Sequence, residues 1–153
     1  MGLAQEPSSL SETYGDWTLQ CSLSNSSSDA EGAVRLCQVS QELRKAGSGD
    51  RIVTVIVNSN PFRMTIVTPL GLLLPEGVEL SVGLHQLPKG AFRTCLSNVG
   101  CVAENEFDAE GLAEIRSSET LSVLMTAESG QKLQVDLSLE GFSDAVMRLE
   151  SIQ

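Results

Sequence analysis

Apolar and polar residues alternate along much of the chain with a period of two. The stretch from Trp17 to Leu23 places an apolar residue at every second position, and the stretch from Leu133 to Leu139 does the same. Successive side chains of a β-strand point to opposite faces, so this pattern predicts strands that are buried on one face only. Further strands are predicted over residues 34–43, 52–57, 63–68, 78–82 and 121–127, and in both arms of a hairpin around Cys95. About nine short strands at this spacing are typical of a sandwich or a barrel.

Helical periodicity is confined to two short segments. Asp108 precedes a segment that ends at Arg116 and can cap its first turn, and the segment from Gly141 to Glu150 carries apolar residues at helical spacing. Both segments are too short to form a layer of their own, so we expect them to cover the sheets. The predicted fold class is therefore all-β, an antiparallel β-sandwich of about nine strands with one or two short covering helices.

The length of 153 residues is close to the commonest size of a single domain. No linker or internal repeat divides the sequence, and we expect one sandwich domain over residues 14–153 after a flexible tail over residues 1–13. Within the tail, Leu3-Ala4 before Gln5 is similar to the small-residue end of a removed signal peptide. This similarity predicts an exported protein.

The chain has four cysteines, and no two of them stand in a Cys-x-x-Cys spacing. An even number at unequal spacings is typical of a disulfide framework, and four cysteines allow three pairings. A turn-like stretch separates Cys95 from Cys101, so a hairpin would place these two opposite each other and leave Cys21 to pair with Cys37. Buried reduced thiols in a cytosolic protein are the alternative.

The charge is strongly negative, with 20 acidic against 10 basic residues and a formal net charge of −10 at pH 7. Such a chain repels nucleic-acid phosphates and anionic lipid headgroups, so we expect no nucleic-acid partner. Residues 106–153 carry 10 of the acidic residues and only 3 of the basic ones. A solvated acidic face is one interpretation of this excess. A docking face for a basic partner, with Glu106, Asp108 and Glu110 among its residues, is the other.

Residues 69–75 form an apolar run with a proline at each end. Proline cannot donate a hydrogen bond to a strand ladder, so a central strand is not predicted here. The leucines of this run fit a buried crossing between two sheets. The alternative is an exposed apolar lip for a protein partner, formed by Leu72, Leu73 and Leu74.

Candidate catalytic chemistry is sparse. His85 is the single histidine, and no Gly-x-Ser-x-Gly elbow accompanies it, so a Ser/His/Asp site is not predicted. With the cysteines in disulfides, one histidine cannot complete a zinc site, and the acidic stretch around Glu106 lacks the spacing of a calcium loop. We therefore predict no catalytic residue, no metal and no cofactor.

Two further classes of protein are addressed by the sequence. No apolar stretch approaches the roughly 20 residues of a membrane-spanning helix, so no membrane span is predicted. A small-ligand or carbohydrate-active domain stays open as an alternative function, because its carboxylates can be distant in sequence and brought together only by the fold.

Several short segments stand in a fixed order around the four cysteines. They are Tyr14-Gly15-Asp16-Trp17, Cys21, Cys37-Gln38-Val39-Ser40-Gln41, residues 68–78, Phe92-Arg93-Thr94-Cys95, Gly100-Cys101-Val102-Ala103 and Ser138-Leu139-Glu140-Gly141-Phe142. This ordered set resembles the invasion-associated locus B family over residues 14–149. The resemblance implies a periplasmic or secreted bacterial protein with an immunoglobulin-like β-sandwich, in a family first described for its association with host-cell invasion. The family offers no catalytic motif to carry over.

The residues and the resemblance together predict an exported, disulfide-bonded, non-enzymatic β-sandwich protein. We expect it to act through contacts with a protein partner in the cell envelope or during host-cell invasion. Its expected location is the periplasm or the exterior of a bacterium. The sequence makes no prediction of oligomeric state.

Overall fold

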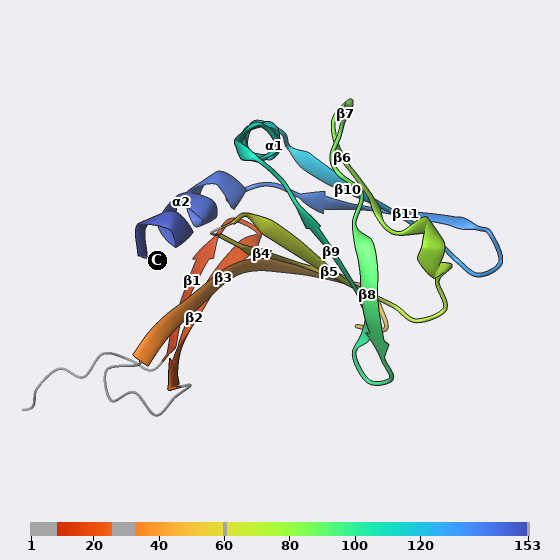
Figure 1. Ribbon diagram of the computed structural model, residues 1–153, viewed down its shortest axis with the longest axis horizontal. Helices are drawn as coiled ribbons and strands as arrows, with labels where there is room; N and C mark the ends of the chain where they lie inside the picture. The colour runs from red at the N-terminus through yellow and green to blue at the C-terminus, as the bar shows by residue number, and fades with distance from the viewer. Residues whose placement is uncertain (1–8, 26–32, 60, 153) are drawn as a thin grey trace, which may run out of the picture.

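The computed structural model describes residues 9–25, 33–59 and 61–152. Over these residues the chain forms two antiparallel sheets, two α-helices and one 3₁₀ turn (Figure 1). The elements in chain order are β1 (Ser9–Tyr14), β2 (Trp17–Asn25), β3 (Ala33–Arg44), β4 (Arg51–Asn58), β5 (Arg63–Thr68), the 3₁₀ turn (Leu74–Glu76), β6 (Glu79–Val82), β7 (His85–Gln86), β8 (Ala91–Leu96), β9 (Gly100–Glu106), α1 (Ala109–Arg116), β10 (Thr120–Thr126), β11 (Lys132–Ser138) and α2 (Phe142–Ile152).

The larger sheet has seven strands in the order β1-β2-β3-β4-β5-β9-β8. Its first five strands follow one another as successive hairpins, and β9 then pairs with β5 after the chain has passed through β6, β7 and β8. Val53, Val55 and Val57 on β4 show why these segments form strands. All three are fully buried while their neighbours are partly exposed, and β-branched residues fit such a half-buried pleated surface.

The smaller sheet has four strands in the order β11-β10-β6-β7. One apolar cluster joins it to the larger sheet. The cluster includes Leu80, Val123 and Leu137 from the smaller sheet and Val55 and Ile66 from the larger one, all of them fully buried. The predicted antiparallel β-sandwich is therefore confirmed.

Two short helices complete the fold, as the periodicity predicts. The carboxylate of Asp108 accepts a hydrogen bond from the backbone N–H of Gly111 at 2.9 Å and so caps the first turn of α1. Helix α2 buries Phe142, Val146 and Leu149 and lies against β1, β2 and β3 (Figure 1). Within the described part of the chain, no helix has the length and apolar character needed to cross a membrane.

Trp17 belongs to the core and links three elements. Its side chain is fully buried, and its indole N–H donates to the carbonyl oxygen of Ser138 at 2.9 Å. Its ring meets the ring of Phe142 edge-on, with 5.0 Å between the ring centroids. A buried aromatic residue whose polar group is satisfied stabilises the packing around it. Trp17 therefore ties β2 to β11 and to α2.

Two glycines allow the β1–β2 turn to touch the segment before α2. Gly15 and Gly141 have positive φ angles of +58° and +85°. A Cβ on Gly141 would collide with the carbonyl oxygen of Tyr14, and a Cβ on Gly15 would collide with that of Glu140. The backbone N–H of Asp16 donates to this Glu140 carbonyl at 3.0 Å. Two of the sequence segments that carry the family resemblance therefore meet here and have a structural role.

Two strands lie outside the predicted set. Strand β1 pairs with β2 along its whole length, from Ser9 opposite Ser22 to Tyr14 opposite Trp17, so residues 9–13 of the expected tail are part of the larger sheet. The sequence of β1 is mostly polar, and only Leu10 and Tyr14 pack against the core, so the alternation is weak. Strand β7 has only two residues, too few for any periodicity.

Candidate functional site

Both disulfides predicted from the sequence are present. Cys21 of β2 and Cys37 of β3 are directly opposite each other in the ladder and only 5% and 3% exposed. Cys95 of β8 and Cys101 of β9 are also direct partners, and they close the hairpin that the spacing predicts. Cys95 is exposed whereas Cys101 is buried. Each bond thus fastens two neighbouring strands of the larger sheet.

The leucine segment is divided between core and surface. Leu72 is 7% exposed and forms a β-bridge with Ala127, so it belongs to the core as the buried-crossing interpretation predicts. Leu73 and Leu74 are 37% and 43% exposed at the start of the 3₁₀ turn. The predicted lip of three leucines is therefore wrong for Leu72, whose side chain faces inward, and of those three only Leu73 and Leu74 face solvent, beside the 51% exposed Leu70.

The acidic residues of the predicted partner surface lie elsewhere, at the end of β9 and the start of α1. Glu106 forms an ion pair with Arg63 across the β5–β9 ladder, with 2.9 Å between Oε1 and Nη2. Asp108 caps α1, and Glu110 is exposed in the first turn, where a negative charge suits a helix N-terminus. Figure 1 shows α1 well away from the 3₁₀ turn that follows Leu73, so the structure does not join the two halves of this surface.

His85 lies in the short β6–β7 hairpin of the smaller sheet. It is opposite Val82 in the ladder, half-buried, and next to the fully exposed Leu84.

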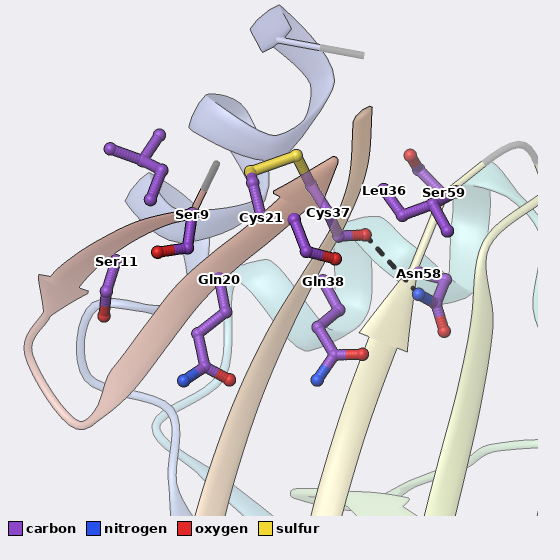
Figure 2. A pocket seen from close by; sticks show the side chains of 11 residues that line it. Ser9, Ser11, Gln20, Cys21, Leu36, Cys37, Gln38, Asn58 and Ser59 are labelled. Carbon is purple, nitrogen blue, oxygen red and sulfur yellow. Dashed lines mark hydrogen bonds between the residues drawn. A yellow bond between two sulfur atoms is a disulfide. The ribbon is translucent and has the colours of Figure 1, made fainter. Parts of the chain in front are cut away.

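A groove of about 700 Å³ crosses β1, β2, β3 and the end of β4 (Figure 2). We call it the β1–β4 groove; it is lined by Ser9, Leu10, Ser11, Gln20, Cys21, Ser22, Leu36, Cys37, Gln38, Asn58 and Ser59. Gln20 and Gln38 are direct partners in the ladder, and Ser11 is opposite Gln20 on its other side. These three side chains alternate with the buried positions of their strands, so they point away from the core.

The chemistry of the β1–β4 groove is that of uncharged hydrogen-bonding groups. Its described lining consists of hydroxyl and amide side chains, the disulfide, Leu10 and the 55% exposed Leu36, without an ionisable side chain. The side-chain amide of Asn58 donates to the carbonyl oxygen of Cys37 at 3.5 Å, a long and therefore weak bond. Hydroxyls and amides both donate and accept hydrogen bonds. The described lining therefore suits an uncharged polar ligand segment.

A second groove, of about 590 Å³, lies where β10 begins and β11 ends. Three carboxylates border it, from Glu119, Asp136 and Glu140. The carboxylate of Asp136 accepts hydrogen bonds from Ser122 at 2.9 Å and from Gln134 at 3.2 Å. This groove holds part of the C-terminal acidic excess that the sequence shows.

A polar cluster fixes β1 to α2. The carboxylate of Glu12 accepts hydrogen bonds from Arg148 at 2.9 and 3.3 Å and from the hydroxyl of Tyr14 at 2.7 Å. The bonds from Arg148, and then that from Tyr14, lower the pKa of the Glu12 carboxyl. The hydrogen bond that Tyr14 donates to Glu12 raises the pKa of the Tyr14 hydroxyl. The hydrogen bonds that Arg148 donates to Glu12 raise the pKa of the Arg148 guanidinium. The cluster holds α2 against the strand that borders the β1–β4 groove.

The fold and the two cross-strand disulfides define a small disulfide-bonded β-sandwich protein. The model of the family described as Invasion associated locus B (IalB) protein matches residues 17–150. The chain therefore belongs to the invasion-associated locus B family, as its sequence segments predict.

Individual relatives agree with this assignment. The chain is 31% identical over 149 residues to an invasion protein B homolog of Brucella abortus (strain 2308), covering 95% of this chain and 82% of that protein. It is 28% identical over 155 residues to invasion protein B of Bartonella bacilliformis, covering 95% of this chain and 77% of that protein. The crystal structure of invasion associated protein B from Bartonella henselae superposes with a TM-score of 0.80 at 25% identity, covering 94% of this chain and 97% of that one.

Proposed function

We propose that this protein is an exported, non-enzymatic β-sandwich that acts through protein–protein contacts in the cell envelope or during host-cell invasion. The observation that carries the proposal is the β1–β4 groove, whose uncharged lining suits binding, in a member of a family whose relatives are named invasion proteins. The partner is a protein segment that presents main-chain amides or uncharged side chains to Gln20, Gln38 and their neighbours.

The two disulfides support export to an oxidising compartment. Disulfides persist in the periplasm and outside the cell, whereas cytosolic thiols are kept reduced. Both bonds here join strands of the sheet that carries the groove. Cell fractionation with immediate alkylation of free thiols tests this part of the proposal. We expect an extracytoplasmic protein that takes up the alkylating agent only after reduction, and a cytosolic protein with free thiols would contradict it.

The leucines and acidic residues that the sequence predicts as a partner surface are secondary contacts in this proposal. Leu73 and Leu74 are exposed, and Glu110 is a solvated acid on α1. Since the leucines and the acids are apart in the fold, we propose that they act as separate secondary contacts and that the β1–β4 groove is the main one.

Binding to membrane fractions tests the contact function. Labelled wild-type protein is titrated onto envelope fractions and onto host-cell membranes, together with Gln38→Lys in the groove. Ser129→Lys, which adds the same charge in the exposed β10–β11 turn, is the control. We expect saturable binding to at least one fraction by wild type and the control, and an affinity lower by about tenfold or more for Gln38→Lys, because an unpaired charge in a docking site costs binding energy. Absence of saturable binding, or equal affinity of Gln38→Lys, would contradict the proposal.

The second groove supports one alternative, a small-ligand or carbohydrate-active domain that uses carboxylates distant in sequence. Glu119, Asp136 and Glu140 are the residues that would serve it. A soluble saccharide that raises the Tm of wild type but not of Glu119→Gln or Glu140→Gln would favour this alternative over the contact function.

A further inference from the structure

Strand β11 is an open edge of the smaller sheet. It pairs with β10 without interruption from Lys132 opposite Thr126 to Ser138 opposite Thr120, and residues 131–134 and 136 are exposed. Edge strands are commonly protected by bulges or by being very short. Strand β8, at the edge of the larger sheet, has such an irregularity at Arg93, and β7 has only two residues. The edge of β11 is long and regular, and its protection comes instead from the charged side chains of Lys132 and Asp136, which disfavour pairing with a strand whose charges do not match.

The register shows which backbone groups of β11 face away from β10. Ala127 donates to the carbonyl of Gln131, and Leu139 donates to the carbonyl of Glu119, so the odd-numbered residues of this strand bond to the β10 side. In an antiparallel ladder the direction alternates, so the backbone groups of residues 132, 134, 136 and 138 point outward. Ser138 agrees with this assignment, because its carbonyl accepts hydrogen bonds from the side chains of Trp17 and Gln41. The edge is thus closed at Ser138 and open at 132–136.

We propose that the open edge of β11 pairs antiparallel with β11 of a second copy of this chain, about a two-fold axis at Gln134. In this register Gln134 exchanges both backbone hydrogen bonds with Gln134 of the partner subunit. Lys132 is then opposite Asp136 of the partner subunit, and the same pair recurs on the other side of the axis. Opposite charges directly across a ladder stabilise it. The strand is therefore complementary to itself in charge.

Other symmetric registers do not have this complementarity. Moving the axis one residue toward Ser138 would place Lys132 opposite a Ser138 whose carbonyl is already bonded to Trp17 and Gln41. Moving it one residue toward the β10–β11 turn would place Asp136 opposite Gly130 of the partner subunit, in that turn. Only the axis at Gln134 gives three outward pairs with both charges matched.

The same pairing also covers an exposed apolar side chain on the core-facing side of β11. Leu133 is 36% exposed although its ladder partner Met125 is only 2% exposed, and Val135 is half-buried. The proposed register places Leu133 beside Val135 of the partner subunit and so covers the exposed leucine. Each chain carries a net charge of −10, and this repulsion is screened beyond about 8 Å at physiological salt. A single strand pair buries little surface, so we expect a weak, concentration-dependent dimer.

Charge reversal at the edge tests the pairing at about 0.15 M salt, where the repulsion is screened. Sedimentation equilibrium is measured up to near-millimolar protein for wild type, Lys132→Asp, Asp136→Lys and an equimolar mixture of the two variants. Each variant alone places like charges across the axis, so the dissociation constant of its dimer should be about tenfold or more higher than that of wild type. The mixture restores opposite charges and should form a heterodimer with an affinity close to that of wild type.

Gln134→Pro gives a second test that spares the fold. Proline is tolerated at an edge position whose N–H faces solvent, so the variant should keep the circular dichroism and Tm of wild type while losing the dimer. A wild-type protein that is monomeric throughout the concentration range would overturn the proposal. So would a dimer that persists in Gln134→Pro, or a mixture of the charge variants that stays monomeric.

Discussion

Gly141 and Gly130 have similar backbone angles, with φ of +85° and +91°, but different surroundings. A Cβ on Gly141 would collide with the carbonyl oxygen of Tyr14, whereas a Cβ on Gly130 meets nothing within 4 Å. Substituting both glycines therefore distinguishes two losses of stability: that of placing a residue with a Cβ in a left-handed conformation, and that of a Cβ colliding with neighbouring backbone.

Alanine at each position should show this difference. We expect Gly130→Ala to lower the free energy of unfolding by about 1–2 kcal/mol, the cost of a left-handed conformation for a residue with a Cβ. Gly141→Ala should lower it by about 3 kcal/mol or more, because displacing packed backbone adds about 1–3 kcal/mol. Urea unfolding of both variants measures the losses, and equal losses would show that the contact of Gly141 with the β1–β2 turn is unimportant.

Glu12 should make stability depend on pH. Its pKa is lowered by Arg148 and then by Tyr14, so its stabilising effect is complete above the unfolded-state pKa of about 4.3 and is lost as the pH falls through the lowered folded-state pKa. Glu12→Gln should therefore have a lower Tm than wild type at neutral pH, and the difference should shrink in strong acid. Thermal unfolding across pH measures this, with Glu128→Gln in the exposed β10–β11 turn as control. A difference that is constant with pH would count against this assignment.

At the scale of elements, strands whose apolar and polar residues alternate clearly can be predicted from the sequence, and the other strands cannot. The buried valines of β4 and the capping residue Asp108 of α1 are visible in the sequence because each reflects a local rule. Strand β1 is stabilised by its ladder with β2 and by the Glu12–Arg148 ion pair. Both interactions depend on parts of the chain outside the strand, so the sequence of β1 alone does not indicate them.

The two cross-strand disulfides should differ in reactivity. Exchange begins when an external thiolate reaches a sulfur. Cys95 is exposed, while Cys21 and Cys37 are 5% and 3% exposed. Under limiting reductant we expect the bond between Cys95 and Cys101 to open first. Differential alkylation with peptide mapping identifies the opened bond, and earlier alkylation of Cys21 and Cys37 would contradict the expectation.

At the scale of the whole molecule, the groove could not be predicted because it depends on strand neighbours. Gln20 and Gln38 are each recognisable as exposed positions of alternating strands, but their contact follows only from the pairing of β2 with β3. The long-range pairing of β5 with β9 likewise separates Glu106 from the leucine segment. The sequence shows uncharged polar residues at the solvent-facing positions of several strands, but only the assembled sheet brings them together into one groove.

Site-specific photocrosslinking tests most directly the claim that the protein acts by contacts through the β1–β4 groove. A photoreactive residue replaces Gln38 in the groove or, as control, Ser129 in the β10–β11 turn, and each protein is irradiated with envelope and host-cell membrane fractions. We expect a discrete protein adduct at position 38 that excess unlabelled wild type abolishes, and no such adduct at position 129. Absence of a competed adduct at position 38 from both fractions would contradict the account.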